Sequence, residues 1–194
     1  YTSSAQNPSI SNATTAMSGT YTVTVSNAIG CTATASTAVT VSNVVATATS
    51  NSPVCAGATL QLSATGGTSY AWSGPASFTA TTQNPTRTAM TAARAGIYTV
   101  TVTTANGTTA TATTNVVVST ITIAPYFNEV VCDGATLQLT ANPTAGSISS
   151  IQWAGPNGNT STQTNPSYPN ATDIYQGDWT VTATNSLGCT DTEV

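Results

Sequence analysis

The sequence has very few charged residues and no histidine. Its 194 residues contain two Lys or Arg, six Asp or Glu and no His, so charged residues make up 4% of the chain, against roughly 25% in an ordinary soluble domain. The absence of His excludes imidazole-based acid–base and triad chemistry and most transition-metal sites. Two cations are too few to neutralise a phosphate backbone, so we expect no nucleic acid as a partner.

Other catalytic patterns are missing as well. No pair of carboxylates has a spacing suited to glycoside hydrolysis, and without Lys or His there is no base to activate a nucleophile. We therefore expect a protein that is not an enzyme and has no cofactor. A calcium site would need several carboxylates at one place, and the acids show no such spacing. We expect no metal site and interpret the acids as solvated surface: Glu129, Asp133, Asp173, Asp178, Asp191 and Glu193.

Long hydrophobic runs and helical patterns are also absent. No stretch reaches the roughly 18 apolar residues of a membrane span, and no apolar period of 3.6 residues is present, so we expect no membrane insertion. Thr and Ser are abundant and together provide 65 of the 194 residues. Hydroxyl residues alternate with apolar ones over 21–25 and 98–102, which is typical of strands with one buried face. The sequence therefore predicts an all-β protein.

Several motifs recur along the chain at a nearly constant distance. Positions 19–23 recur at 96–100 and 177–181, and positions 54–62 recur at 131–139. The first interval is 77 residues, from Tyr21 to Tyr98, and the second is 81, from Tyr98 to Trp179. The additional residues fall around 142–146, which predicts a lengthened loop in the last unit.

The repetition divides the chain into three units. Residues 1–43 form the C-terminal part of one repeat, 44–120 form a complete repeat, and 121–194 form a repeat that stops inside its last strand. We therefore expect the chain to be a segment of a longer polypeptide. In the complete repeat, strands are expected at 44–49, 58–64, 69–73, 97–104 and 108–118, with a less regular stretch at 76–92. About seven short strands separated by turn residues predict a Greek-key sandwich.

The motifs of the units resemble those of immunoglobulin-like domains. Trp72 holds the position of the core Trp of the third strand, and Tyr98, after Gly96, resembles a tyrosine corner. The pattern includes Val-Cys-x-Gly-x-Thr-Leu-x-Leu, Trp-x-Gly-Pro, Gln-Asn-Pro, Gly-x-Tyr-Thr-Val-Thr-Val and Asn-x-x-Gly-Cys-Thr. It is similar to the tandem immunoglobulin-like repeats of giant bacterial cell-surface adhesins and filament proteins of gliding bacteria. The resemblance covers the whole chain and implies tandem immunoglobulin-like Greek-key β-sandwiches.

The sequence departs from this family pattern in three ways. Trp179 replaces the corner Tyr and lacks its hydroxyl group. Thr108 stands where the other units have Cys. The usual disulfide between the second and sixth strands is absent, because the corresponding inward positions hold Leu62 and Val100.

The four cysteines lie at two kinds of turn. Cys55 and Cys132 come just before the second strand of a sandwich, whereas Cys31 and Cys189 follow the turn before the last strand. These turns lie at opposite ends of a sandwich, about 25–30 Å apart for a strand of eight or nine residues, and a disulfide needs Cα atoms within about 7 Å. A Cys132–Cys189 bond within one unit is therefore disfavoured.

Tandem sandwiches bring opposite ends of neighbouring repeats together. Our hypothesis is an inter-repeat bond between Cys55 and Cys189, with Cys31 and Cys132 bonded to repeats outside this sequence. The alternative is four buried or free thiols. The linkers 39–45 and 116–121 contain no Gly or Pro and keep strand character, which predicts a stiff rod.

Several surface features have a functional and a plain interpretation. Asn12, Asn106, Asn159 and Asn170 are candidates for N-linked glycosylation because each begins an Asn-x-Ser/Thr sequon. The outward Thr rows are candidates for glycan attachment or for a glycan-binding or ice-binding face, but Thr also suits any exposed strand, and we favour that explanation. For Arg87 and Arg94 we expect simple exposure, with an inter-strand or inter-subunit contact as the alternative.

Three functions are compatible with these observations. The first is a structural segment of a long filament or surface fibre, extracellular or on the cell surface, whose partners are neighbouring repeats or identical subunits. The second is an adhesin stalk or binding module that recognises glycans or other cells, for which exposed aromatic residues are candidates: Tyr70, Phe78, Tyr126 and Phe127. The third is a spacer in a secreted multidomain protein. The low charge, which limits repulsion between copies, favours the first.

Overall fold

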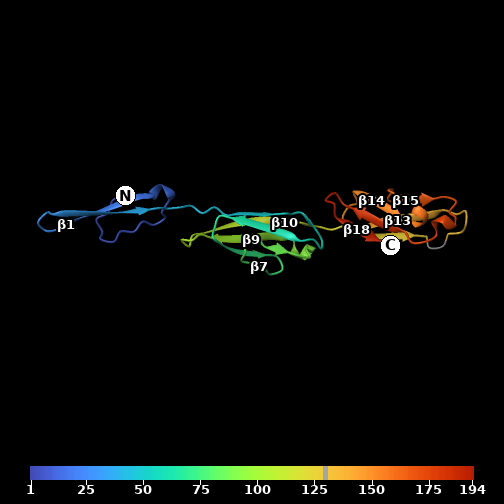
Figure 1. The fold of residues 1–194 in the computed structure, drawn as a ribbon, viewed down its shortest axis with the longest axis horizontal. Helices are drawn as coiled ribbons and strands as arrows, with labels where there is room; N and C mark the ends of the chain where they lie inside the picture. The colour runs from blue at the N-terminus through green and yellow to red at the C-terminus, as the bar shows by residue number, and fades with distance from the viewer. Residues whose placement is uncertain (129–130) are drawn as a thin grey trace.

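The computed structural model describes residues 1–128 and 131–194 and is built almost entirely from β-strands, which confirms the predicted class. Figure 1 shows three parts along one long axis: an N-terminal hairpin, a middle β-sandwich and a C-terminal β-sandwich. Short 3₁₀ turns lie between strands: η1 (Thr15–Met17), η2 (Ala92–Arg94), η3 (Pro156–Gly158) and η4 (Asp173–Tyr175).

The N-terminal part is a single antiparallel hairpin of β1 (Gly19–Ser26) and β2 (Thr32–Val39). Its apolar face is open. Val23 and Val25 are 55% and 59% exposed, whereas Val100 and Val102, which hold the corresponding positions in the middle sandwich, are fully buried. Within the described residues, no second sheet packs on this hairpin.

The middle sandwich contains two sheets. The first has the order β3 (Thr47–Ser50), β5 (Leu60–Thr65), β8 (Thr86–Arg87), and the second has the order β10 (Thr109–Val116), β9 (Gly96–Thr103), β6 (Ser69–Gly74), β7 (Phe78–Ala80). A short strand, β4 (Val54–Cys55), leaves the first sheet and pairs in parallel with β11 (Val118–Ser119), which continues from β10. This strand order is the Greek-key arrangement of an immunoglobulin-like domain.

Alternate positions of the central strands supply the core of this sandwich. The buried side chains on β5, β6 and β9 are Leu60, Leu62, Ala64, Trp72, Tyr98, Val100 and Val102. The Thr residues between them face outward, so the period of two in the sequence matches the two sides of the pleated sheet. Each large apolar side chain buried here contributes about 1.5–3 kcal/mol to stability.

The C-terminal sandwich repeats this plan. One sheet has the order β12 (Thr122–Phe127), β13 (Leu137–Ala145), β16 (Ser167–Tyr168), and the other has the order β15 (Thr160–Ser161), β14 (Ser150–Ala154), β17 (Thr180–Thr184), β18 (Thr190–Glu193). Its core includes Leu139, Trp153 and Val181, which are at most 1% exposed. Each sandwich thus has its own hydrophobic cluster.

Two local sequence predictions were wrong. Residues 142–146 do not form a lengthened loop, because β13 continues to Ala145 and pairs with β12 across a register shift between Thr122 and Ile123. The linker 39–45 does not keep strand structure: β2 ends at Val39 and β3 begins at Thr47. The described residues offer this linker no neighbouring strand, and a strand needs a partner for its backbone groups.

A corner hydrogen bond recurs at the start of β1, β9 and the segment before β17. The hydroxyl of Tyr21 donates to the Met17 carbonyl and that of Tyr98 to the Arg94 carbonyl, both at 2.9 Å. Trp179 makes the same contact with a different atom, since its indole Nε1 donates to the carbonyl four residues earlier, at Tyr175, at 3.3 Å. The substitution of Trp for the corner Tyr therefore preserves the bond in spite of the lost hydroxyl.

Replacing Tyr98 by Phe tests the corner. The Tyr98 hydroxyl also accepts a 2.8 Å hydrogen bond from Arg87 Nη1, so Tyr98→Phe removes one of the two acceptors of this charged donor and leaves the Arg94 carbonyl without its donor. We expect the free energy of local opening of β9, measured by amide hydrogen exchange, to fall by about 1–3 kcal/mol. Tyr70→Phe is the control, because that hydroxyl makes one bond, to the Gly67 carbonyl at 2.9 Å. If Tyr98→Phe and Tyr70→Phe lowered this free energy equally, the corner hydrogen bonds would have no special role in stabilising β9.

Candidate functional site: the disulfide-bonded junction

The two sandwiches are joined by a very short connection. β11 pairs with β4 of the middle sandwich up to Ser119, and Ile121 already belongs to the core of the C-terminal sandwich, where it is 5% exposed. Thr120 is the single residue between these two anchored positions. A connection this short leaves the backbone little freedom to bend between the sandwiches.

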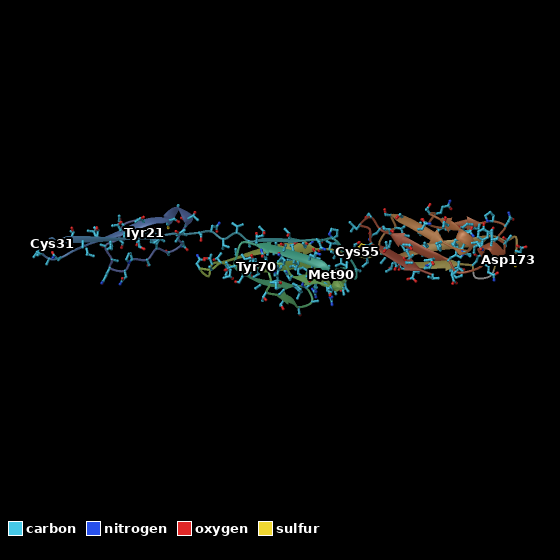
Figure 2. The ribbon with its side chains drawn as sticks, viewed as in Figure 1. Tyr21, Cys31, Cys55, Tyr70, Met90 and Asp173 are labelled. Carbon is cyan, nitrogen blue, oxygen red and sulfur yellow. A yellow bond between two sulfur atoms is a disulfide. The ribbon has the colours of Figure 1, made fainter. Side chains whose placement is uncertain are left out.

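A disulfide between Cys55 and Cys189 bridges the same junction, and it is the pairing that the sequence predicts. The two Cα atoms are 5.5 Å apart, although 134 residues separate the cysteines in the sequence. Cys55 comes from β4 of the middle sandwich and packs against the hydrophobic cluster of the C-terminal sandwich, in which Cys189 is 4% exposed. Figure 2 shows Cys55 at the boundary between the two sandwiches.

Asn185 holds the turn that presents Cys189 to the junction. Its side-chain Oδ1 accepts hydrogen bonds from the backbone N–H groups of Leu187, at 2.9 Å, and Cys189, at 3.0 Å. Its Nδ2 donates across the junction to Ser119 Oγ at 2.8 Å. Asn185 is 8% exposed, so one buried amide both shapes the turn and ties it to the neighbouring sandwich.

The cysteines were predicted as site residues from the sequence, but Asn185 was not. The turn of the β1–β2 hairpin has the same pair, Asn27 and Cys31, at the same spacing, whereas the middle sandwich has Thr104 and Thr108 at both positions. In these three turns, Asn at the first position is therefore always accompanied by Cys four residues later, and both are absent together. That correlation within one chain is the signal that identifies the asparagine.

Among the described residues, Cys31 and Cys132 are exposed free thiols. Cys31 lies at the turn of the β1–β2 hairpin, and Cys132 lies before β13, where its position corresponds to that of Cys55. The structure therefore contains one bonded pair and two further cysteines at corresponding positions.

The expectation that both arginines are simply exposed was wrong. Arg87 is half-buried, donates from Nη1 to the Pro75 carbonyl at 2.7 Å, and lies 5.1 Å from the centre of the Phe78 ring. Arg94 donates from Nη1 to two carbonyls of the preceding loop at 2.9 Å each. Both guanidinium groups satisfy loop carbonyls of the middle sandwich, where their donors replace water.

The candidate glycosylation residues differ in what their side chains do. Asn12, Asn106 and Asn170 are exposed. Asn159 is half-buried, and its Nδ2 donates to the Pro156 carbonyl at 2.8 Å and to the Ile174 carbonyl at 3.3 Å. A glycan on Asn159 would cost hydrogen bonds that the other three sites do not make with the same atom.

Three of the acids line one cavity at the far end of the C-terminal sandwich. The cavity has a volume of about 550 Å³, and its lining includes Asp133, Asp173, Asp178, Phe127, Tyr175 and Trp179. Tyr168 packs on Trp179 with a ring distance of 5.2 Å, and burial raises the pKa of Tyr168 above its ordinary value. Glu129 lies outside the described residues. Residues 1–128 and 131–194 contain no group of three or more His, Cys, Asp or Glu that could hold a metal ion.

The aromatic residues proposed for a binding surface do not form one cluster. Tyr70 and Phe78 are half-buried and pack on the core of the middle sandwich, while Tyr126 and Phe127 lie exposed on β12. The helical segments in the described part of the chain are all too short to cross a membrane.

No protein-family model and no curated protein matches this sequence. Solved structures with a similar fold include murine CEACAM1b, which is 15% identical with a TM-score of 0.37 and is matched over 73% of this chain and 92% of that one. The amphioxus IgVJ-C2 molecule is 21% identical with a TM-score of 0.34 over 71% and 94%. Three N-terminal domains of the bacteriophage RB49 highly immunogenic outer capsid protein (Hoc) are 17% identical with a TM-score of 0.43 over 77% and 58%.

The role of Asn185 can be tested through the chemical stability of the disulfide. Asn185→Ala leaves the Leu187 and Cys189 N–H groups without their acceptor and Ser119 without its donor, and each such buried loss costs about 1–3 kcal/mol. We expect Cys55–Cys189 to be reduced by a dithiol at least about tenfold faster, measured by alkylation and mass spectrometry. Asn27→Ala changes the matching turn of the hairpin and serves as control. An unchanged reduction rate in Asn185→Ala would contradict this role.

Proposed function

We propose that this chain is a structural segment of a long extracellular filament or surface fibre made of rigidly joined immunoglobulin-like repeats. In this proposal residues 1–43, 44–120 and 121–194 are parts of successive repeats. The partners are neighbouring repeats or identical subunits, and Cys31 and Cys132 bond to repeats beyond those of this chain.

The observation that carries the proposal is the path that tension takes through the covalent structure. A force applied between the two ends of the chain reaches Cys55, crosses the disulfide to Cys189 and continues to the C-terminus. The 134-residue separation between these cysteines contains most of both sandwiches. Tension therefore bypasses them, and they remain folded under loads that would otherwise pull them open.

Other properties support a load-bearing extracellular role. A disulfide persists in oxidising surroundings, which favours a location outside the cytosol. The short junction at Thr120 and the interactions of Asn185 stiffen the rod at the point where a tandem protein would otherwise bend. The scarcity of charge leaves little electrostatic repulsion between copies that lie side by side.

Single-molecule force measurement tests the load path. With handles at the two ends of the chain, we expect the oxidised protein to gain almost no contour length from the sandwiches. Reduction should release the 134-residue interval, which adds roughly 440–480 Å at about 3.3–3.6 Å per residue. Cys55→Ser/Cys189→Ser should behave as the reduced protein without reductant, and Cys31→Ser should behave as the wild type.

One outcome would contradict the proposed load path. If the oxidised protein and Cys55→Ser/Cys189→Ser lengthened by the same amount at the same force, the bond would carry no tension. The chain would then serve as a spacer rather than as a mechanical element.

The alternative is an adhesin stalk or binding module that recognises glycans or other cells. The cavity lined by Trp179, Tyr175 and three carboxylates favours it, because aromatic faces combined with acceptor oxygens suit a sugar ring. Binding of soluble oligosaccharides, detected as a change in Trp fluorescence that disappears in Asp173→Ala, would support this alternative.

A further inference from the structure

The turn of the β1–β2 hairpin has the same internal geometry as the turn that carries Cys189. Asn27 Oδ1 accepts from the N–H groups of Ile29, at 3.1 Å, and Cys31, at 2.9 Å. The Asn27 N–H donates to the Cys31 carbonyl at 3.0 Å, as the Asn185 N–H does to the Cys189 carbonyl at 2.9 Å. The hairpin therefore presents Cys31 in a turn with the same hydrogen bonds as the turn whose cysteine forms the disulfide at the other junction.

The two turns differ in how deeply they are buried. Asn27 is exposed where Asn185 is 8% exposed, and Ile29 is 84% exposed where Leu187 is 53% exposed. No described group accepts a hydrogen bond from Asn27 Nδ2, whereas the same atom of Asn185 binds Ser119. The hairpin turn therefore has the hydrogen bonds of the Cys189 turn but is exposed.

Part of the matching half of such a junction, the turn that carries the cysteine, is present elsewhere in the chain around Cys132. The Ala135 N–H donates to the Cys132 carbonyl at 2.9 Å, as the Ala58 N–H does to the Cys55 carbonyl at 3.1 Å. The next glycine in each turn, Gly134 or Gly57, donates its N–H across the sandwich, at 2.9 and 2.7 Å respectively. Cys132 is thus an exposed free thiol in a turn with the hydrogen bonds of the Cys55 turn, although within the described residues no strand pairs with it as β11 pairs with β4.

The two free halves cannot meet within one molecule. Figure 2 shows Cys31 at one end of the elongated chain and Asp173 at the other. Asp173 lines the same cavity as Asp133, the residue next to Cys132. The free halves therefore face outward at opposite ends.

We propose that two copies of this chain join head to tail, with Cys31 of one copy bonded to Cys132 of the next. Such a contact is heterologous, because it joins different surfaces of the two copies. Each copy in a joined pair still has one free cysteine at its opposite end, so further copies can add and form an open filament. This inference rests on the proposed fibre function and deepens it by naming the partner and the residues that join it.

The bond forms by thiol–disulfide exchange with a small disulfide such as oxidised glutathione. The Cys31 thiolate attacks one glutathione sulfur, which yields a mixed disulfide and releases one glutathione thiolate. The Cys132 thiolate of the second copy then attacks the Cys31 sulfur and releases the second glutathione thiolate. Two protein thiols lose two protons and two electrons, and one molecule of oxidised glutathione becomes two thiols.

Two single variants test the pairing. In oxidised glutathione, the wild-type protein should form a ladder of covalent oligomers on non-reducing gels. Cys31→Ser and Cys132→Ser should each remain monomeric alone, because each keeps one half of the junction. A mixture of the two should form heterodimers and stop there, and these should exceed either homodimer by about tenfold or more, since docking raises the effective thiol concentration.

The hairpin asparagine provides a second readout. Asn27→Ala, placed in Cys132→Ser, should slow heterodimer formation with Cys31→Ser several-fold. Thr104→Ala, at the corresponding position of the middle sandwich, whose turn has no cysteine, is the matched control and should have no effect. Homodimers that form as fast as heterodimers, or an Asn27→Ala rate equal to the control, would overturn the proposal. Neither result would alter the load path through Cys55–Cys189, so failure of this inference is distinguishable from failure of the proposed function.

Discussion

The covalent bond between Cys55 and Cys189 is the constraint on which the rest of this structure depends. It ties the start of one sandwich to the end of the next, across 134 residues of sequence. In the chain-entropy description, closing a loop of that length removes freedom from the unfolded chain worth about 5 kcal/mol. The bond also makes the two sandwiches one unit, because it is a second covalent link beside the backbone connection at Thr120. Asn185 and Ser119 add a buried hydrogen bond at the same place, so the junction is specific in geometry as well as covalent.

The two sandwiches that the disulfide joins are stabilised by a simple alternation of buried and exposed side chains. Apolar and polar residues alternate along β5 and β9, which buries every second side chain and leaves Gln, Ser and Thr on the outer face of β5 and Thr on that of β9. The few charged side chains described next make hydrogen bonds to groups of their own sandwich. Arg87 binds the Tyr98 hydroxyl and a loop carbonyl, and Asp191 Oδ2 accepts from the Ile123 N–H at 2.8 Å. Within residues 1–128 and 131–194, the stability of the sandwiches therefore comes from strand pairing, burial and the junction.

Much of the fold could be predicted from the sequence because alternation and spacing are local signals. Trp72 and Tyr98 marked the third and sixth strands, and opposite turn positions led to the Cys55–Cys189 pairing. What could not be predicted depends on contacts made in space. Residues 142–146 had turn composition, but pairing with β12 places residues 142–145 in β13. The exposure of Arg87 was predicted wrongly because its acceptors lie in a different loop. The sequence shows that Trp179 lacks the hydroxyl of the corner Tyr, but it does not show that the indole N–H makes the same hydrogen bond.

The measurement that tests the central claim most directly is electron microscopy of native, unreduced material, with the same material examined after reduction. A disulfide-locked rod predicts straight fibres with a regular axial repeat set by successive sandwiches, and loss of straightness after reduction. Isolated flexible tethers that end in a distinct globular head, with no change on reduction, would contradict the account.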